Sequence, residues 1–353
     1  MSESDVKICF CGSGSGGHLK PLVSLYLKLG MLQSKSFFIC SPHPFDQSFI
    51  QDWDLPTEFL TYTRISQGNV LFVIWKIFYC LIEVLYIFLK KKPDLVIGTG
   101  GYGSFPVYLA CVLLNIDFYI IEPNSICGKV NRWFQTRAKK IFTNFSNVLG
   151  LQALDSICHS GVPLVYEKPC FTQDKLVLIF GASLGAQSIN KFMKSYFEAY
   201  GADESYSYVW ITGASEYEEY KYFQEHGNIE VFPFVKEMQQ YLQRASLVIS
   251  RSGAGCVADV KHFQIPAIFV PYPHHADRQQ YLNAQDLNES GACMIWEESS
   301  LSDLEYNRAS ELKKVLNSGA LKDMKSRFSQ NPQENAVETI LKIVLKGKLI
   351  GTR

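Results

Sequence analysis

The 353-residue chain has no excess of charge of either sign, because its 34 Lys and Arg residues balance 34 Asp and Glu residues. No net field therefore draws it to the phosphates of nucleic acid, and we expect no nucleic-acid partner. Its 10 cysteines include no CxxC pair and no paired metal-ligand spacing, a pattern typical of reduced thiols in a cytoplasm. No apolar stretch precedes the first expected strand, so we expect no secretory signal.

The chain does contain enough apolar sequence for two cores. Its length exceeds the roughly 250–300 residues at which single cores stop growing, and 47% of its residues are hydrophobic. Short apolar runs alternate with helical patterns in two series, which are separated by turn residues at 161–163. This alternation predicts an α/β fold of two Rossmann-like, doubly wound domains that face a central cleft, residues 1–161 and 164–330. A last helix over 333–348 suits packing on either domain.

The expected elements follow from these runs. The strands of the first series are expected at 6–11, 37–40, 59–62, 95–97 and 118–121, with helices beginning near residues 18, 45, 69, 104 and 126. The strands of the second series are expected at 176–180, 208–212, 229–232, 247–250, 267–270 and 292–295.

Glycine-rich turns follow four of these strands. They lie at residues 12–17, 98–103, 181–186 and 250–255. Glycine lets the backbone approach a ligand closely, and the N-terminus of the following helix attracts an anion. Turns that follow neighbouring parallel strands face the same crevice of the sheet. Two such turns in each half therefore predict two phosphorylated ligands.

The first turn also fits the dinucleotide motif GxGxxG, but its surroundings do not. That motif needs an acidic residue at the end of the second strand, about 20 residues further on, to hold a ribose. Here the strand ends at Cys40 and Ser41, and Asp46 lies in the next expected helix. A P-loop is excluded as well, because His18 and Leu19 stand where Lys and Ser or Thr are required.

The segment from Val70 to Leu89 is almost entirely apolar and aromatic, with only Lys76 and Glu83 charged, and it is followed by three lysines at 90–92. Its length matches the ~20 residues that cross a bilayer. Two features argue against a helix that crosses the membrane. The segment contains two charged residues, and it lies between strands of a single sheet. A buried core helix is a second interpretation. We favour a third, in which one face packs on the core and the aromatic face lies in the membrane interface, with the lysines against anionic lipid.

Six motifs, in order along residues 6–290, resemble the signatures of the MurG family of peptidoglycan N-acetylglucosaminyltransferases. They are Gly-Ser-Gly-Ser-Gly-Gly-His at 12–18, Gly-Thr-Gly-Gly-Tyr at 98–102, Glu-Pro-Asn at 122–124, Gly-Ala-Ser-Leu-Gly-Ala at 181–186, Arg-Ser-Gly-Ala at 251–254 and Asp-Arg-Gln-Gln-Tyr at 277–281. The resemblance implies a GT-B fold and an inverting, metal-independent transfer of N-acetylglucosamine from UDP-GlcNAc to the C4 hydroxyl of MurNAc in lipid I, giving lipid II. It also implies that the last helix crosses back to the N-terminal domain.

Two alternatives remain open at this point. One is a GT-B nucleotide-sugar enzyme with a different lipid acceptor, and the other is a non-catalytic scaffold at the membrane. The resemblance implies a peripheral protein on the cytoplasmic face of the cell membrane that uses residues 70–92 as its membrane surface. It also implies roles in cell shape and cell division, with cell-wall or division proteins as further partners.

The resemblance assigns the acceptor site to the first half. His18 is the expected general base, since a histidine at a helix N-terminus is kept neutral there; a hydrogen-bonding role at the helix end is the alternative. Asn124 is expected to bind a sugar, with Glu122 as its orienter or an alternative base; a buried strand-end turn is the plainer interpretation. The acceptor diphosphate is expected to lie against Ser15, Gly16, Gly17, Gly100, Gly101 and Tyr102.

The donor site is assigned to the second half. Asp259 is expected to accept both ribose hydroxyls of UDP, because a carboxylate offers two oxygens to a vicinal diol. The diphosphate is expected on Ser183, Gly253 and Ala254, the uracil beside Phe234, Val235 and Met238, and the sugar hydroxyls on Gln279 and Gln280. Arg251 is a cationic candidate for this site, as is Arg278, and a structural ion pair is the alternative for each.

Four residues depart from the family pattern. Asp259 replaces a glutamate, Leu184 and Pro123 replace glutamines, and Val165 stands where an arginine commonly assists the donor phosphate. Losing that arginine forfeits a charge-assisted contact of about 1.5–3 kcal/mol. We expect no cofactor, since UDP-GlcNAc is the substrate. We also expect no metal site, since no third ligand is spaced with the pair His274–His275.

Overall fold

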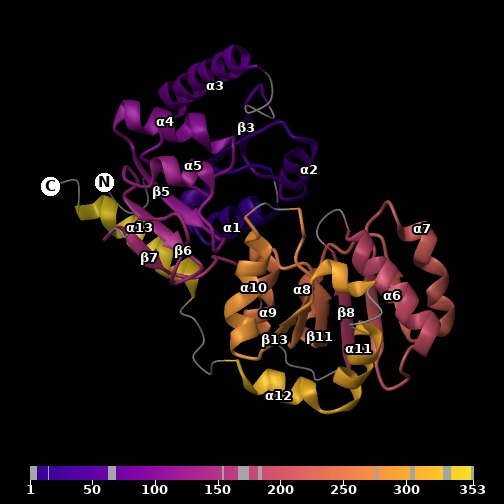
Figure 1. Ribbon diagram of the computed structural model, residues 1–353. Helices are drawn as coiled ribbons and strands as arrows, with labels where there is room; N and C mark the ends of the chain where they lie inside the picture. Colours follow the sequence, from indigo (N-terminus) through magenta and orange to yellow (C-terminus); the bar gives the residue numbers. More distant parts are fainter. Residues whose placement is uncertain are drawn as a thin grey trace. The chain divides into compact units, whose positions relative to one another are not determined.

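The computed structural model describes residues 6–14, 16–62, 69–152, 155–165, 175–181, 185–274, 277–302, 307–328 and 335–350. The chain divides into two compact units, residues 1–165 together with 333–353, and residues 166–332. Each unit contains one parallel sheet with helices on its faces (Figure 1). The α/β class expected from the sequence is therefore confirmed.

The first unit is built on a seven-stranded sheet of order β3-β2-β1-β4-β5-β6-β7, parallel throughout. Its strands are β1 (Ile8–Cys11), β2 (Phe37–Cys40), β3 (Thr57–Phe59), β4 (Leu95–Gly98), β5 (Asp117–Glu122), β6 (Lys140–Thr143) and β7 (Ile157–His159). Its helices are α1 (Gly16–Leu27), η2 (Gly30–Lys35), α2 (Pro44–Asp52), α3 (Val70–Lys91), α4 (Ser104–Leu114), α5 (Lys129–Phe134) and α13 (Ala336–Ile350).

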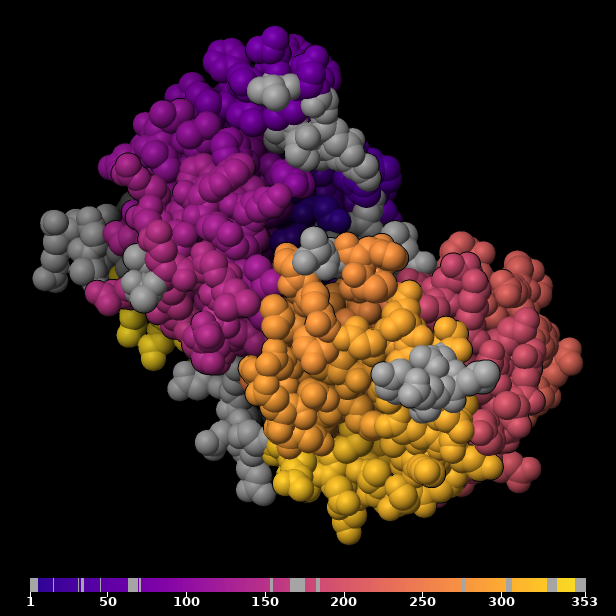
Figure 2. Space-filling model, viewed as in Figure 1, coloured from indigo at the N-terminus to yellow at the C-terminus, as the bar shows by residue number. Residues whose placement is uncertain are grey.

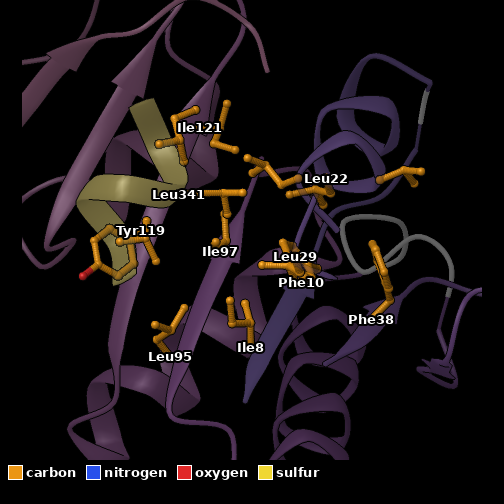
Figure 3. Close-up of a cluster of buried hydrophobic side chains, with 14 of the residues drawn as sticks. Ile8, Phe10, Leu22, Leu29, Phe38, Leu95, Ile97, Tyr119, Ile121 and Leu341 are labelled. Atoms are coloured by element: carbon orange, nitrogen blue, oxygen red, sulfur yellow. The ribbon is translucent and has the colours of Figure 1, made fainter. Parts of the chain in front are cut away.

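Alternate side chains of the central strands separate two cores in this unit. Ile8 and Phe10 of β1 pack in one cluster with residues of α1 and α13, whereas Cys9 and Cys11 pack in the other with residues of α3, α4 and α5. Figure 3 shows Leu341 of α13 close to the sheet residues of the first cluster. The last helix therefore completes the core of the first unit.

The second unit contains a six-stranded parallel sheet of order β10-β9-β8-β11-β12-β13. Its strands are β8 (Leu176–Phe180), β9 (Ser207–Ile211), β10 (Ile229–Phe232), β11 (Ala245–Ser250), β12 (Ala267–Phe269) and β13 (Cys293–Ile295). Its helices are α6 (Gln187–Tyr200), α7 (Tyr217–Tyr220), η3 (Lys221–His226), α8 (Met238–Arg244), α9 (Ala254–Phe263), α10 (Gln279–Glu289), η4 (Glu298–Leu301), α11 (Arg308–Asn317) and α12 (Ala320–Ser326).

Strand order reverses once in each sheet, at β1 beside β4 and at β8 beside β11. The register pairs Cys11 with Gly98, and Phe180 with Ser250, so each pair of strands ends at the same level. Ligands of open α/β sheets bind at such reversals, outside the carboxyl ends of the strands. All four glycine-rich turns lie at these two positions.

Some elements differ from the sequence-based prediction. The third strand covers 57–59 rather than 59–62, because the Thr61 N–H donates to the Glu83 carboxylate of α3 at 3.1 Å and not to β2. The helix expected near Ile126 begins at Lys129, after Gly128. β6 and β7 were not predicted. They are short strands of four and three residues whose apolar runs are too brief to be recognised.

Helix α3 has two unlike faces. Cys80, Val84 and Phe88 are buried against the core of the first unit. The opposite face exposes nine large apolar side chains, namely Leu71, Phe72, Ile74, Trp75, Phe78, Tyr79, Ile82, Tyr86 and Leu89. In the space-filling view α3 forms a ridge at the top of the first unit (Figure 2). The segment Leu71–Lys91 is long and apolar enough to cross a membrane, but it packs along one side on this unit.

Candidate functional site

The two glycine-rich turns of the first unit are in direct contact with each other. The Gly103 N–H donates to the Ser13 hydroxyl at 3.0 Å. Gly101 has φ +79°, and a Cβ there would lie 2.7 Å from the Ser13 carbonyl oxygen. Only glycine fits this position. The turn after β1 and the turn after β4 thus form one backbone surface.

Helix α1 begins at Gly16, directly after the first turn. The first four N–H groups of a helix have no intrahelical partner and, with the helix dipole, favour an anion. Gly17 is exposed and Gly16 half-buried, and Tyr102 of the neighbouring turn is half exposed. These residues form a surface suited to a phosphate. Ser15, expected in this site, lies outside the described residues.

His18 lies in the first turn of α1, and its ring is fixed by the second glycine-rich turn. Its Nδ1 is 3.0 Å from the Thr99 carbonyl oxygen, and the Thr99 hydroxyl donates back to the His18 carbonyl at 2.9 Å. A carbonyl oxygen only accepts, so Nδ1 carries the proton in the neutral ring and Nε2 keeps a free lone pair. Burial lowers the pKa of the imidazole, while the Thr99 bond and the charge of Asp46 act in the opposite direction. The ring is thus arranged to accept a proton at Nε2.

Glu122, at the end of β5, is buried and bound by the turn that follows it. Its carboxylate accepts the Gly128 N–H at 2.9 Å, the Asn124 N–H at 3.2 Å and the Asn131 side-chain N–H at 2.9 Å. Burial raises the pKa of this carboxyl group, and these hydrogen bonds lower it. The Asn124 amide also donates to Glu122, at 3.4 Å. Glu122 therefore orients the turn that carries Asn124.

Asn131 connects this carboxylate to the histidine. Besides Glu122, its side-chain N–H lies 3.4 Å from the Thr99 carbonyl, the same oxygen that binds His18. The structure therefore brings the three residues expected to act in catalysis, His18, Glu122 and Asn124, into one hydrogen-bonded group. Asn131 was missed in the sequence, where its only signal was an amide between the apolar residues of a short helix.

The second unit repeats the arrangement at the reversal of its sheet. Gly253 precedes α9, which begins at Ala254, and Asp259 lies buried on the second turn of that helix. Gly185, with φ +82°, approaches Thr212 so closely that a Cβ would lie 2.4 Å from its carbonyl oxygen. Ser183 and Leu184 lie outside the described residues. Gly185 and Gly253 thus lie beyond the ends of the neighbouring strands β8 and β11, and Asp259 lies on the helix that Gly253 precedes.

Both arginines of this unit's candidate site are bound within the protein. Arg251 donates at 3.1 Å to the carbonyls of Val270 and Pro271 and to the Ser188 hydroxyl, and it pairs with Glu298. Arg278 pairs with Glu297 and lies 4.2 Å from the centre of the Tyr281 ring. Arg251 thus forms a largely buried ion pair and Arg278 an exposed one, and the donor-site role of each stays a prediction.

The remaining expected donor contacts lie at neighbouring strand ends. Phe234 is exposed after β10, Val235 is half-buried, and Met238 begins α8. Gln279 begins α10, and the Gln280 side chain accepts the Tyr272 N–H at 2.9 Å. Asn283, on the same helix, is buried and donates to the Ser252 carbonyl at 3.2 Å. Asn283 was also missed in the sequence, and it joins α10 to the turn after β11.

The described parts of the chain contain no group of three or more His, Cys, Asp or Glu side chains that could hold a metal ion. His275 lies outside the described residues.

Comparison with known proteins covers most of the chain. The N-terminal domain of glycosyltransferase family 28 matches residues 8–143, and the C-terminal domain of that family matches residues 176–340. A UDP-N-acetylglucosamine--N-acetylmuramyl-(pentapeptide) pyrophosphoryl-undecaprenol N-acetylglucosamine transferase of Desulforamulus reducens is 29% identical, over 95% of this chain and 97% of its own. Its counterpart from Carboxydothermus hydrogenoformans is 28% identical, over 84% and 86% of the two chains.

Among solved structures, MurG of Acinetobacter baumannii superposes with a TM-score of 0.77 at 24% identity, over 96% of this chain and 99% of its own. The likeness shows a shared fold, and the GT-B class expected from the resemblance is confirmed.

We predict that His18 in the resting protein is neutral above pH 6.5 and carries its proton on Nδ1. Because burial lowers its pKa, it should gain a second proton only below the usual value of about 6.5. Nitrogen-15 NMR of histidine-labelled protein, with His18→Gln to assign the signal, reports both tautomer and midpoint. A proton on Nε2, or a midpoint above 6.5, would contradict the geometry described here.

Proposed function

Because this chain belongs to glycosyltransferase family 28, we propose that it transfers N-acetylglucosamine from UDP-GlcNAc to the C4 hydroxyl of MurNAc in lipid I, giving lipid II for peptidoglycan synthesis. The resemblance to the MurG family is confirmed by the N-acetylglucosamine transferases that match 84% and 95% of this chain and by the solved MurG structure that shares its fold. The observation that carries the proposal is the fixed His18 ring beside two joined glycine-rich turns.

In this proposal the first unit binds lipid I. Its diphosphate lies against the N-terminus of α1, on Gly16 and Gly17, and against the turn of Gly101 and Tyr102. His18 Nε2 removes the proton of the C4 hydroxyl, and the oxygen attacks the anomeric carbon of the donor as the bond to UDP breaks. Attack from the side opposite to UDP inverts that carbon. Asn124, held by Glu122, binds the acceptor sugar.

The second unit binds the donor. Asp259 accepts the ribose hydroxyls of UDP, and the N-terminus of α9 at Gly253 and Ala254 stabilises the charge that grows on the leaving diphosphate. Val165, which stands where the family has an arginine, belongs to the first unit and is half-buried among apolar neighbours. Its side chain has no charge to offer the donor phosphate.

The histidine is tested first by substitution. His18→Ala should lower kcat by roughly 10²–10⁴, because a general base is lost. UDP release from UDP-GlcNAc is measured with and without a short-chain lipid I analogue. His159→Ala, which removes an exposed histidine of the same unit, is the control and should leave kcat unchanged. Activity of His18→Ala within a factor of a few of wild type would remove His18 from this role. Wild-type protein that binds UDP but releases none in response to the acceptor would point to another acceptor or to a scaffold.

The ribose assignment is tested in the same assay. Asp259→Ala should raise KM for UDP-GlcNAc roughly 10- to 100-fold, because hydrogen bonds to a charged group are worth about 1.5–3 kcal/mol. KM for the acceptor should not change. Asp259→Glu restores two carboxylate oxygens and should stay near wild type, and Asp286→Ala removes an exposed acid of the same unit as a control. An unchanged donor KM in Asp259→Ala would count against the assignment.

We also propose that the exposed face of α3 binds the cytoplasmic membrane surface, where a lipid acceptor is found. A contiguous apolar face of this size marks an interaction site. Lys90 and Lys92 at its end are exposed, whereas Lys91 pairs with Glu58 at 2.7 Å. Apolar side chains beside exposed lysines are the features that bind an anionic membrane interface.

The membrane proposal is tested with vesicles. Replacing Trp75 and Phe78 by alanine should weaken binding to phosphatidylglycerol vesicles by roughly 10-fold or more, since each buried aromatic side chain contributes about 1.5–3 kcal/mol. Co-sedimentation at rising salt measures the lysine contribution. Trp53→Ala removes an exposed tryptophan outside α3 and should bind as wild type does. If the variant without Trp75 and Phe78 binds the vesicles as tightly as Trp53→Ala does, α3 is excluded as the membrane surface.

A further inference from the structure

Asp46 is a fully buried carboxylate to which neither the sequence motifs nor the proposed mechanism gives a role. It lies in the first turn of α2 and has 0% of its surface exposed. A buried ionised carboxylate is costly unless hydrogen bonds and favourable dipoles compensate for the lost water. Its partners therefore indicate what it holds in place.

Those partners belong to the first glycine-rich turn and to the end of β2. The Gly14 N–H donates to both carboxylate oxygens, at 3.0 and 3.1 Å. The Ser41 hydroxyl donates to one of them at 2.6 Å. Hydrogen bonds to an ionised acceptor are about twice as strong as those between neutral groups. Asp46 is thus attached firmly to the turn between β1 and α1.

The contact fixes the part of the turn where the chain changes direction. Gly14 has φ +94° and is exposed, so no core packing holds it. Its neighbour Ser13 is bound on the other side by the Gly103 N–H. The turn is therefore anchored to α2 through Gly14 and to the turn after β4 through Ser13. The chain enters α1 at Gly16, directly after this anchored turn.

We propose that Asp46 is a positioning residue for the acceptor: its carboxylate holds the Gly12–Gly14 turn so that the N-terminus of α1 and His18 are aimed at the acceptor's diphosphate and sugar hydroxyl. The inference rests on the proposed function. It adds a residue that touches no substrate and acts through the Gly14 N–H.

The test compares three variants in acceptor-dependent UDP release. Asp46→Ala removes the anchor and should lower kcat/KM for a lipid I analogue by about 10²-fold, the scale of an ångström-sized misplacement, with KM for UDP-GlcNAc within a factor of two of wild type. Asp46→Asn keeps one oxygen for the Gly14 N–H and should recover most of the loss. Ser36→Ala is the matched control. It removes a buried hydroxyl that binds Leu32 and Ile8 in the same unit, away from the turn.

Hydrogen exchange gives a second measurement that does not depend on turnover. In Asp46→Ala, amides of residues 12–18 should exchange faster, and in Asp46→Asn less so, while those of β8 to α6 are unchanged in both variants. If Asp46→Ala does not fold, the same two measurements are made on Asp46→Asn and on Ser41→Ala, which removes one donor to the carboxylate. Both variants should show a smaller loss of acceptor kcat/KM than the one given for Asp46→Ala, together with faster amide exchange in residues 12–18 than in wild type.

Two results would overturn the inference. One is a loss of activity that matches Ser36→Ala or affects donor and acceptor alike, because Asp46 would then only stabilise the core. The other is an unchanged acceptor kcat/KM in an active protein. Wild-type protein without acceptor-dependent release would instead overturn the proposed function and this inference with it.

Discussion

The parallel pairing of β1 with β4 is the constraint on which the first site depends. It places Cys11 level with Gly98, so the two turns that follow emerge side by side. The two turns lie so close that a Cβ on Gly101 would be 2.7 Å from the Ser13 carbonyl oxygen. The glycines therefore serve two purposes, since they permit the backbone contact that joins the turns and leave helix N-termini uncovered. β8 and β11 repeat this logic in the second unit.

Buried polar groups fix what the backbone pairing brings together. Glu122 and Asp46 are both removed from water, and each is satisfied by N–H or O–H donors from turns near the candidate acceptor site. Such donors compensate the free-energy cost of burying a carboxylate only when the surrounding structure keeps them at hydrogen-bonding distance. The two carboxylates thus fix the positions of Asn124 and Gly14 by hydrogen bonds from buried groups. A histidine whose tautomer is set by a backbone carbonyl completes this arrangement.

Helix α3 combines a buried face and an exposed apolar face. Its inner face contributes Cys80, Val84 and Phe88 to the same core that supports β1 and β4, while its outer face remains apolar and exposed. Burying the inner face holds the helix along the unit. The proposed contact of the outer face with lipid therefore requires no part of the sheet to unfold.

The sequence by itself determined the two parallel sheets, the four glycine-rich turns and the amphipathic character of α3, because each is a local pattern of apolar spacing and glycine. Family motifs also led to the prediction that His18, Glu122 and Asn124 act in catalysis, and their catalytic roles stay a prediction. The sequence did not reveal Asn131 or Asp46, and it left Arg251 open between substrate and ion pair. Their roles depend on contacts between residues far apart in the chain, such as Gly14 with Asp46 and Arg251 with Glu298. Only the packing of helices on the sheets decides such contacts, because it sets which buried polar groups meet.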